Sequence, residues 1–232
     1  MERKGFERFA PLTGLLFLAL AIASFIVGGE APEADESLQE VIEFWEDNDS
    51  SQIASALLGV YAAFFLVWFA GSVRSAVARV EGAGSRLASL AFGGAVISAA
   101  GITVNAAVQF TAADSIGDIS PEATQALSVF YSDFFFPFAV GNALFLTAAG
   151  LAAVRHGAFD RWLGWMAIVI GVISITPLGF FGFIGSLAWV GIAAVVLYRK
   201  TDPVGSGAVP PSSGGVPPSA GGPPPAGPEA PA

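Results

Sequence analysis

Six long apolar runs occupy most of this sequence, and they constrain its fold more than any other feature. They lie at about residues 12–28, 53–73, 87–110, 131–154, 162–177 and 180–198. A helix needs about 20 residues to cross the hydrocarbon core of a bilayer, and four of the runs reach or approach that length. Only 12% of the residues are charged, about half the share in a soluble domain. The sequence therefore predicts an all-α fold, a polytopic transmembrane helix bundle.

The last two runs decide the number of spans. Taken as one helix, residues 162–198 would extend about 55 Å, far more than the thickness of the core. Thr176-Pro177-Leu178-Gly179 interrupts them, because proline disfavours helix at the preceding residue and glycine tolerates turn conformations. We therefore predict two short spans joined by a tight turn, and six spans in total.

All ten Lys and Arg residues fall on one side of this six-span scheme. They are Arg3, Lys4, Arg8, Arg74, Arg79, Arg86, Arg155, Arg161, Arg199 and Lys200. The outer loops are acidic and contain neither Lys nor Arg, and a five-span chain would separate Arg161 from Arg199. Basic residues stay on the cytoplasmic side of membrane proteins. We therefore predict a multi-pass protein of the plasma membrane whose N- and C-termini are both cytoplasmic.

The first run has two interpretations. A basic start, an apolar stretch and Ala21-Ile22-Ala23 as a cleavage site are typical of a secretory signal peptide. The run of about 17 residues is longer than the usual signal core of about 7–15. We expect an uncleaved anchor, and cleavage would leave five spans with the same sidedness.

The segment between the first two spans carries a helix-start signal. In Ser37-Leu38-Gln39-Glu40, the Ser37 side chain can accept from the Glu40 amide while the Glu40 side chain reaches back to the Ser37 amide. Apolar residues then recur at helical spacing: Leu38, Val41, Ile42 and Trp45. We predict a short amphipathic helix in the first outer loop. Its apolar stripe covers the outer end of the bundle or rests at the lipid interface; the alternatives are a lid and an acidic surface for cations.

A second outer helix is predicted to begin at Ser120-Pro121-Glu122. Serine suits the N-cap, proline suits the first turn, and an acidic residue there meets the positive end of the helix dipole. We expect this helix to run into the fourth span, in which Pro137 is the one position where a kink would change the direction of the side chains.

Polar residues inside the spans are candidate functional residues, because hydrocarbon disfavours them. The candidates are Asn105, Gln109, Asp133 and Asn142. Asn105 and Gln109 share a helix face, and Asp133 borders the fourth span at a similar height, where it could bond to either. These three residues indicate one of two arrangements. They form a hydrogen-bond clamp between two helices, or they form a shallow outward-facing site for a cation or a small hydroxylated molecule. Asn142 lies on the face of the fourth span opposite Asp133, and we expect it to form a single interhelical hydrogen bond there.

The residue inventory excludes several kinds of chemistry. Without Cys, disulfides, thiol catalysis and cysteine-bound metals are impossible. The one His, His156, lies in a cytoplasmic loop, so neither a histidine-rich metal site nor an intramembrane Ser–His pair can form. Glu81-Gly82-Ala83-Gly84-Ser85 lacks the Gly-Lys-Ser/Thr ending of a phosphate-binding loop. We predict no enzymatic activity, no cofactor, no metal and no nucleic-acid partner.

The end of the chain differs in composition from the rest. Residues 201–232 include ten Pro, seven Gly and four Ser, and they have too few large apolar side chains to form a core. We predict a transmembrane domain over residues 1–200 and a disordered, Pro/Gly/Ser-rich cytoplasmic tail over residues 201–232.

The layout of the chain resembles a known family. A short basic start and a first span precede an acidic outer loop with a small helix, and Arg161-Trp162-Leu163-Gly164-Trp165 opens a Gly-containing apolar hairpin. This layout, over roughly residues 8–200, is similar to that of the bacterial membrane proteins of domain-of-unknown-function family 4386. The resemblance implies six spans in a bacterial inner membrane and assigns no catalytic or binding residue.

These observations predict a six-helix bundle in a bacterial plasma membrane that acts as a non-enzymatic membrane component or interaction module. The alternative is a transporter or channel subunit for a small solute or an ion, which would use Asn105, Gln109 and Asp133. The expected partner is the lipid bilayer, and a second copy of the chain and another membrane protein are further candidates.

Overall fold

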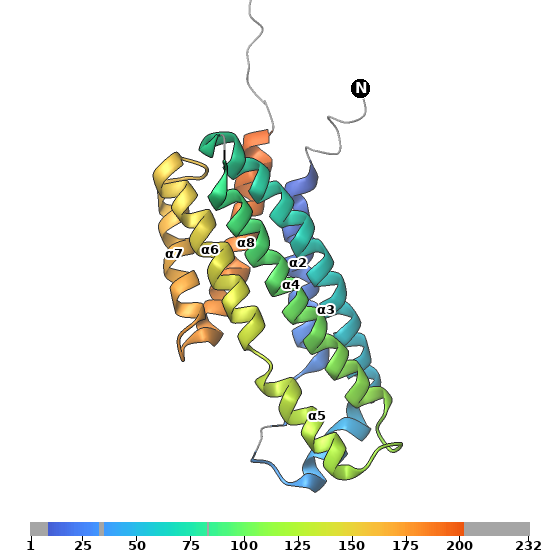
Figure 1. Ribbon diagram of the computed structural model, residues 1–232. Coiled ribbons are helices and arrows are strands. Elements are labelled where there is room, and N and C mark those ends of the chain that lie inside the picture. The colour runs from blue at the N-terminus through green and yellow to red at the C-terminus, as the bar shows by residue number, and fades with distance from the viewer. Residues whose placement is uncertain (1–8, 33–34, 83, 202–232) are drawn as a thin grey trace, which may run out of the picture. The chain divides into compact units, whose positions relative to one another are not determined.

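The computed structural model describes residues 9–32, 35–82 and 84–201, and every regular element in these ranges is a helix (Figure 1). In chain order the helices are η1 Ala10–Leu12, α2 Thr13–Gly28, α3 Leu38–Glu81, α4 Arg86–Asp114, α5 Pro121–Asp133, α6 Phe136–His156, α7 Arg161–Ser174 and α8 Gly179–Thr201. The predicted basic start at Arg3, Lys4 and Arg8 and the predicted tail from residue 202 onward lie outside the described residues.

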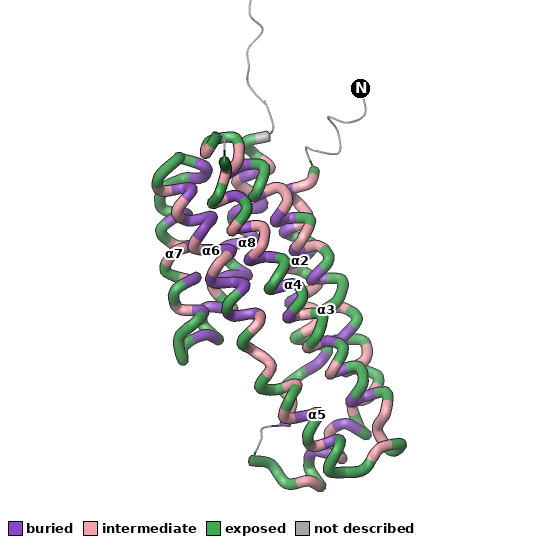
Figure 2. Tube along the Cα trace, viewed as in Figure 1, coloured by how far each residue is buried: buried purple, intermediate pink, exposed green. Residues whose placement is uncertain are grey.

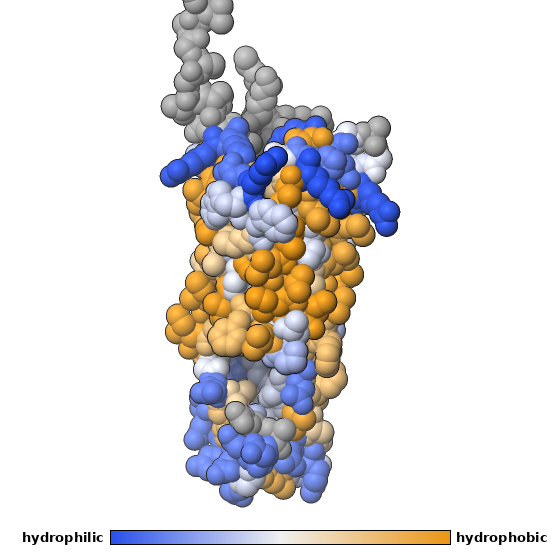
Figure 3. All heavy atoms as spheres, turned by 90° about the vertical axis from the view of Figure 1, so that its left-hand side faces the viewer, coloured by the Kyte–Doolittle hydropathy of each residue, from blue (hydrophilic) through white to orange (hydrophobic). Residues whose placement is uncertain are grey.

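Five helical stretches are long and apolar enough to cross a membrane. They are Ala10–Gly28, Leu38–Glu81, Arg86–Asp114, Pro121–His156 and Gly179–Lys200. Helix α7 is also apolar but has only 14 residues. Figure 3 shows the apolar side chains as a belt with hydrophilic residues at both ends. The predicted all-α fold is therefore confirmed, and its long apolar helices are compatible with a helical membrane bundle.

Helix α3 begins at the predicted capping box but is not the short helix that we expected. The Ser37 hydroxyl and amide both donate to Glu40 Oε2, at 2.7 and 2.9 Å, and they hold the pKa of Glu40 below its ordinary value. The Glu40 amide in turn donates to Ser37 Oγ at 3.4 Å. The helix then continues over 44 residues to Glu81, so the prediction of a separate short outer helix is wrong. Residues 48–52 are polar, but they contain neither the proline nor the glycine that would stop a helix.

Helices α5 and α6 are separated by a break at Phe134, which corrects the expectation of one helix running into the fourth span. In a continuous helix the Pro137 nitrogen would have to donate to the Asp133 carbonyl, and proline has no N–H and would collide with that carbonyl. The carbonyl instead accepts from the Phe135 amide at 2.7 Å. With φ −75° and ψ 62°, Phe134 has the backbone of an inverse γ-turn.

Helices α7 and α8 form the predicted hairpin. Helix α7 ends at Ser174 and α8 begins at Gly179, with the predicted turn between them. The Gly179 amide donates to the Thr176 carbonyl at 2.9 Å, which closes the turn. The Trp189 indole of α8 donates to the Leu163 carbonyl of α7 at 3.0 Å, so the two helices are also joined near the start of α7.

Glycines allow α4 and α6 to approach closely. A Cβ atom on Gly94 would lie only 2.7 Å from the Gly141 carbonyl oxygen, and a Cβ atom on Gly141 would lie 2.7 Å from the Gly94 carbonyl oxygen. Both helices carry buried residues along most of their length (Figure 2). The two backbones are therefore in direct contact at this crossing.

Charged side chains are sorted between the two ends of the bundle. One end of the bundle contains the end of α3, the start of α4, the end of α6, the start of α7 and the end of α8. The Lys and Arg residues that the structure describes all lie toward this end: Arg74, Arg79, Arg86, Arg155, Arg161, Arg199 and Lys200. We call this the basic end. The opposite end, with the start of α3 and with α5, carries Asp and Glu but no Lys or Arg within the described ranges, and we call it the acidic end.

Candidate functional site

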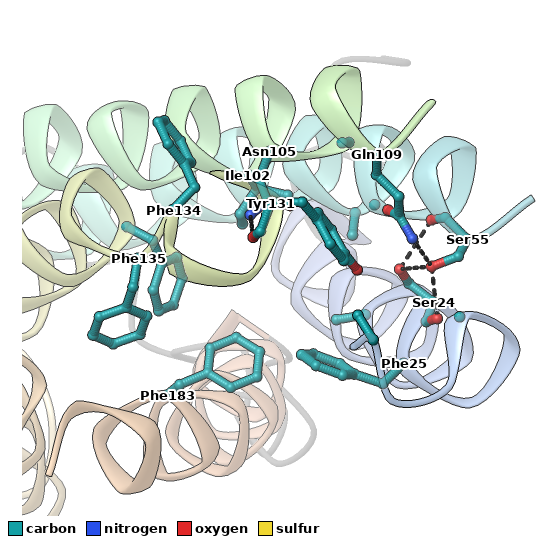
Figure 4. Close-up of a pocket in the computed structure, with 18 of the residues that line it drawn as sticks. Ser24, Phe25, Ser55, Ile102, Asn105, Gln109, Tyr131, Phe134, Phe135 and Phe183 are labelled. Atoms are coloured by element: carbon teal, nitrogen blue, oxygen red, sulfur yellow. Dashed lines mark hydrogen bonds between the residues drawn. The ribbon is translucent and has the colours of Figure 1, made fainter. Parts of the chain in front are cut away.

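A cavity of about 420 Å³ lies in the half of the bundle nearer the acidic end. Its walls come from α2, α3, α4 and α8, from the end of α5 and the start of α6, and from the connection between these two helices (Figure 4). The break at Phe134 turns α5 away from the line of α6, and the α7–α8 turn stops short of the acidic end (Figure 1). The cavity occupies the space that these two features leave.

Phenylalanine rings form a large part of the cavity wall. The seven that line it are Phe17, Phe25, Phe134, Phe135, Phe138, Phe180 and Phe183. The Phe183 ring centre lies 5.2 Å from that of Phe25 and 5.1 Å from that of Phe138. No Asp, Glu, Lys, Arg or His is among the lining residues. A wall of this kind favours an apolar molecule and disfavours an ion, which would lose its hydration without gaining a partner.

One end of the cavity is polar, because three helices are tied together there by side-chain amides. Gln52 Nε2 of α3 donates to the Gly28 carbonyl at the end of α2, at 2.5 Å. Gln52 Oε1 accepts from Gln109 Nε2 of α4 at 2.7 Å. Gln52 and Gln109 are 1% and 4% exposed, so both amides are buried in the bundle. We call this chain from Gly28 to Gln109 the amide relay.

Two serines extend the polar end and fix α2 against α3. Ser24 Oγ donates to the Ser55 carbonyl and Ser55 Oγ donates to the Ser24 carbonyl, both at 2.9 Å. Gln109 Nε2 also reaches Ser55 Oγ, at 3.1 Å. Ser24, Ser55 and Gln109 all line the cavity, so its polar end is built from uncharged groups on α2, α3 and α4 (Figure 4).

The structure brings Asn105 and Gln109 to the same cavity, but with partners that the sequence did not identify. Asn105 Nδ2 donates to the Tyr131 backbone carbonyl of α5 at 3.0 Å. This bond is an interhelical clamp of the predicted kind, made to the backbone two residues before Asp133. Gln109 instead bonds to Gln52 and Ser55 of α3.

Asp133 does not join this group, and the expectation that it could bond to Asn105 or Gln109 is corrected. Its side chain is exposed, and it does not line the cavity. The reason is the break at Phe134, because Asp133 ends α5 instead of beginning a span. The cavity therefore has no carboxylate with which to hold a cation.

Asn142 lies away from the cavity, on the other side of α6. It is 4% exposed, and its Nδ2 donates to Ser174 Oγ of α7 at 2.8 Å. This is the single interhelical hydrogen bond that we expected. Asn142 does not line the cavity, so no continuous polar path connects it with Asn105 and Gln109.

Sequence reasoning missed Gln52, Ser55, Ser24 and Tyr131. Gln52 falls just before the second apolar run, and for that reason it was not considered as a residue of a span. A signal was nevertheless present, since Gln52 and Ser55 continue at helical spacing the stripe that contains Val41 and Trp45, all of them buried in α3. Ser24 and Tyr131 carry no such signal in the sequence.

The cavity reaches the surface of the bundle at its side. Phe25 and Phe180 line it and yet are 55% and 64% exposed, so their rings border an opening. Figure 3 shows a recess at the edge of the apolar belt on the face turned toward the viewer. A molecule could enter there from the region of the belt.

Comparisons with known proteins found no match to this chain: no family model, no curated protein and no solved structure is similar to it. The resemblance to domain-of-unknown-function family 4386 therefore stays a prediction. Among the described residues, no three His, Asp or Glu side chains are grouped closely enough to hold a metal ion.

Proposed function

We propose that this chain is a six-span protein of a bacterial plasma membrane, related to family 4386, with both termini in the cytoplasm. It acts without chemistry, as a membrane-embedded component that binds an apolar molecule from the bilayer in its cavity. The observation that carries the proposal is a cavity lined by seven phenylalanines and no charged group, with an opening toward the apolar belt.

The sorting of charge supports the proposed sidedness. The basic end contains every described Lys and Arg, as expected for the cytoplasmic face. Helix α7 is about 21 Å long, shorter than the core of about 30 Å. The α7–α8 hairpin returns to the basic end whether its turn reaches the outer surface or stops within the outer leaflet, so the C-terminus is on the same side in both cases.

A transporter is the second candidate function, favoured by the placement of Asn105 and Gln109 in a cavity near the acidic end. Transport requires a passage onward to the basic end. There, α4 packs through Ala88, Ala91 and Ala95, each 0% exposed. Small side chains in close contact leave no room for a solute, so a passage would need α4 to separate from its neighbours. Binding without transport needs no such movement.

Photolabelling can test whether the cavity binds an apolar chain. The probe is hexadecanol carrying a diazirine midway along its chain, added to the full-length protein in phosphatidylethanolamine–phosphatidylglycerol vesicles. Mass spectrometry locates the adducts. We expect them on lining residues such as Phe25 and Phe183. Adducts confined to the outer surface of the belt would overturn the proposal.

A matched pair of variants separates cavity binding from contact with lipid. Ile102 lines the cavity on α4, whereas Ile97 on the same helix is 41% exposed on the outside of the bundle. Ile102→Trp should fill the cavity and abolish labelling of its wall, while Ile97→Trp should leave that labelling unchanged. Asp133→Asn should also have no effect, because Asp133 lies outside the cavity. Loss of labelling in Asp133→Asn would instead favour the polar group first expected from the sequence.

A further inference from the structure

We propose that the polar end of the cavity recognises an uncharged hydroxyl head group, so that the ligand is a long-chain or lipid alcohol. This inference rests on the proposed binding function and names the class of molecule that is bound. It follows from two hydrogen-bonding groups at the polar end that have no partner within the described part of the chain.

The first group is Gln109 Oε1, and the amide relay fixes its identity. The Gly28 carbonyl can only accept, so Gln52 must present Nε2 to it and Oε1 to Gln109. Gln109 must therefore present Nε2 to Gln52. The same Nε2 reaches Ser55 Oγ, whose own proton is donated to the Ser24 carbonyl. The orientation of both amides is thus determined by an acceptor that cannot be exchanged.

Gln109 Oε1 consequently accepts no hydrogen bond from a described residue, and it is accessible from the cavity. Gln109 is 4% exposed, and its recorded hydrogen bonds all use Nε2. Figure 4 shows its oxygen on the side of the amide that faces Tyr131. A donor on a ligand that reaches this oxygen would supply the hydrogen bond that the described residues do not.

The second group is the Tyr131 hydroxyl. Tyr131 lines the cavity, and its side chain extends from α5 toward the end where Ser24 and Gln109 lie (Figure 4). Its ring packs against Trp45, with 5.9 Å between ring centres, and its backbone carbonyl is held by Asn105. The ring is therefore fixed while the hydroxyl has no hydrogen bond to a described residue. It can donate to a ligand oxygen.

An acceptor and a donor at the same end of the cavity fit an alcohol. A hydroxyl group can donate to Gln109 Oε1 and accept from Tyr131 at the same time. A carboxylate or a phosphate would meet the Gln109 oxygen with no cation nearby, because the lining residues include no Lys, Arg or His. An alkane would leave both groups without partners. The chain of the alcohol would then lie along the phenylalanine wall and leave through the opening beside Phe25 and Phe180.

Competition for photolabelling tests this head-group selectivity. The diazirine hexadecanol probe is mixed with one of four unlabelled competitors of equal chain length: hexadecanol, its methyl ether, hexadecane and hexadecyl sulfate. The alcohol donates and accepts, the ether only accepts, the alkane does neither, and the sulfate is charged. We expect the alcohol to compete best, by about two- to tenfold over the ether and the alkane, and the sulfate to compete least.

Tyr131→Phe is the decisive variant, because it removes only the hydroxyl oxygen and keeps the ring against Trp45. It should lower the advantage of the alcohol by about two- to tenfold while the cavity is still labelled. Tyr61→Phe is the control, since Tyr61 is 59% exposed on α3 and does not line the cavity. It should leave the selectivity unchanged.

The outcomes separate this inference from the proposed function. If the probe never labels the cavity wall, the binding function itself fails. If the wall is labelled but the four competitors are equivalent, or the sulfate competes best, the cavity binds chains without reading an alcohol head group. Selectivity for the alcohol that survives Tyr131→Phe would also overturn the role assigned to the Tyr131 hydroxyl.

Discussion

Replacing Gly94 by alanine should destabilise the bundle strongly, although it adds only one methyl group. The new Cβ would lie 2.7 Å from the Gly141 carbonyl oxygen and 2.9 Å from Phe145 Cα, both backbone atoms that cannot rotate away. It would lie nearer still to the Phe145 backbone nitrogen, and since an ordinary contact begins at 3.4 Å, α4 and α6 would have to separate by at least about 0.7 Å. A gap of that size forfeits a quarter to a half of the dispersion attraction along the crossing. We expect Gly94→Ala to cost about 1–3 kcal/mol of unfolding free energy.

The neighbouring glycine is a matched control for this prediction. A Cβ on Gly93 would meet no atom within 4 Å, and Gly93 lies in the same helix. Gly93→Ala should therefore stabilise by about 0.5–1 kcal/mol through the better helix propensity of alanine. Unfolding of both variants in mixed micelles of a mild detergent and dodecyl sulfate, followed by circular dichroism, measures the difference of about 1.5–4 kcal/mol. Equal stability of the two variants would refute the direct backbone contact of α4 with α6.

Two further predictions concern single polar contacts. The Leu87 amide, followed by the Ala88 amide and the nearby charge of His156, holds the pKa of Glu81 below its ordinary value at the basic end. Because the pKa of Glu81 is lowered in the folded chain, its contribution to stability is present at neutral pH and is lost as the pH falls through the folded-state pKa. Acidification should therefore lower the melting temperature of the native chain more than that of Glu81→Gln. The melting temperatures of both proteins are measured as the pH is lowered. Equal decreases in the two melting temperatures would contradict this prediction. A double-mutant cycle with Asn142→Ala and Ser174→Ala should give a coupling of about 0.6 kcal/mol, typical of a hydrogen bond between membrane helices, and additive losses would show that the bond contributes nothing.

Local signals predicted where several elements begin and turn. The Ser37–Glu40 capping box starts α3, Ser120 accepts from the Ala123 amide at the start of α5, and the turn before Gly179 separates α7 from α8. In each case the residues that specify the conformation are within four positions of one another. Such signals act through the local backbone and need no knowledge of the rest of the fold.

Two features of the fold were not predicted because the chain lacks a local signal or because a signal has more than one outcome. The outer helix was expected to be short and separate from the second span, whereas a polar stretch without Pro or Gly stays helical when its flanks are helical. Pro137 was expected to kink a helix at most. It ends one, because the Asp133 carbonyl finds the Phe135 amide as another partner.

The candidate site could be predicted only in part. Polarity identified Asn105 and Gln109, which do line the cavity. Their partners Gln52 and Tyr131 depend on how α3 and α5 are placed beside α4, and this is a property of the tertiary packing. Asp133 was assigned to the group from its expected height in the membrane, and a change of chain direction one residue later removed it.

The uninterrupted course of α3 has a consequence for how the protein can move. At about 1.5 Å per residue, its 44 residues form a rod about 66 Å long that carries Trp45 near one tip and Val77 near the other. Because α3 has no break between Trp45 and Val77, the residues around Trp45 cannot move independently of the rest of α3, as a hinged segment would. Movement at this end of the bundle is easiest for α5, whose attachment to α6 is a single γ-turn.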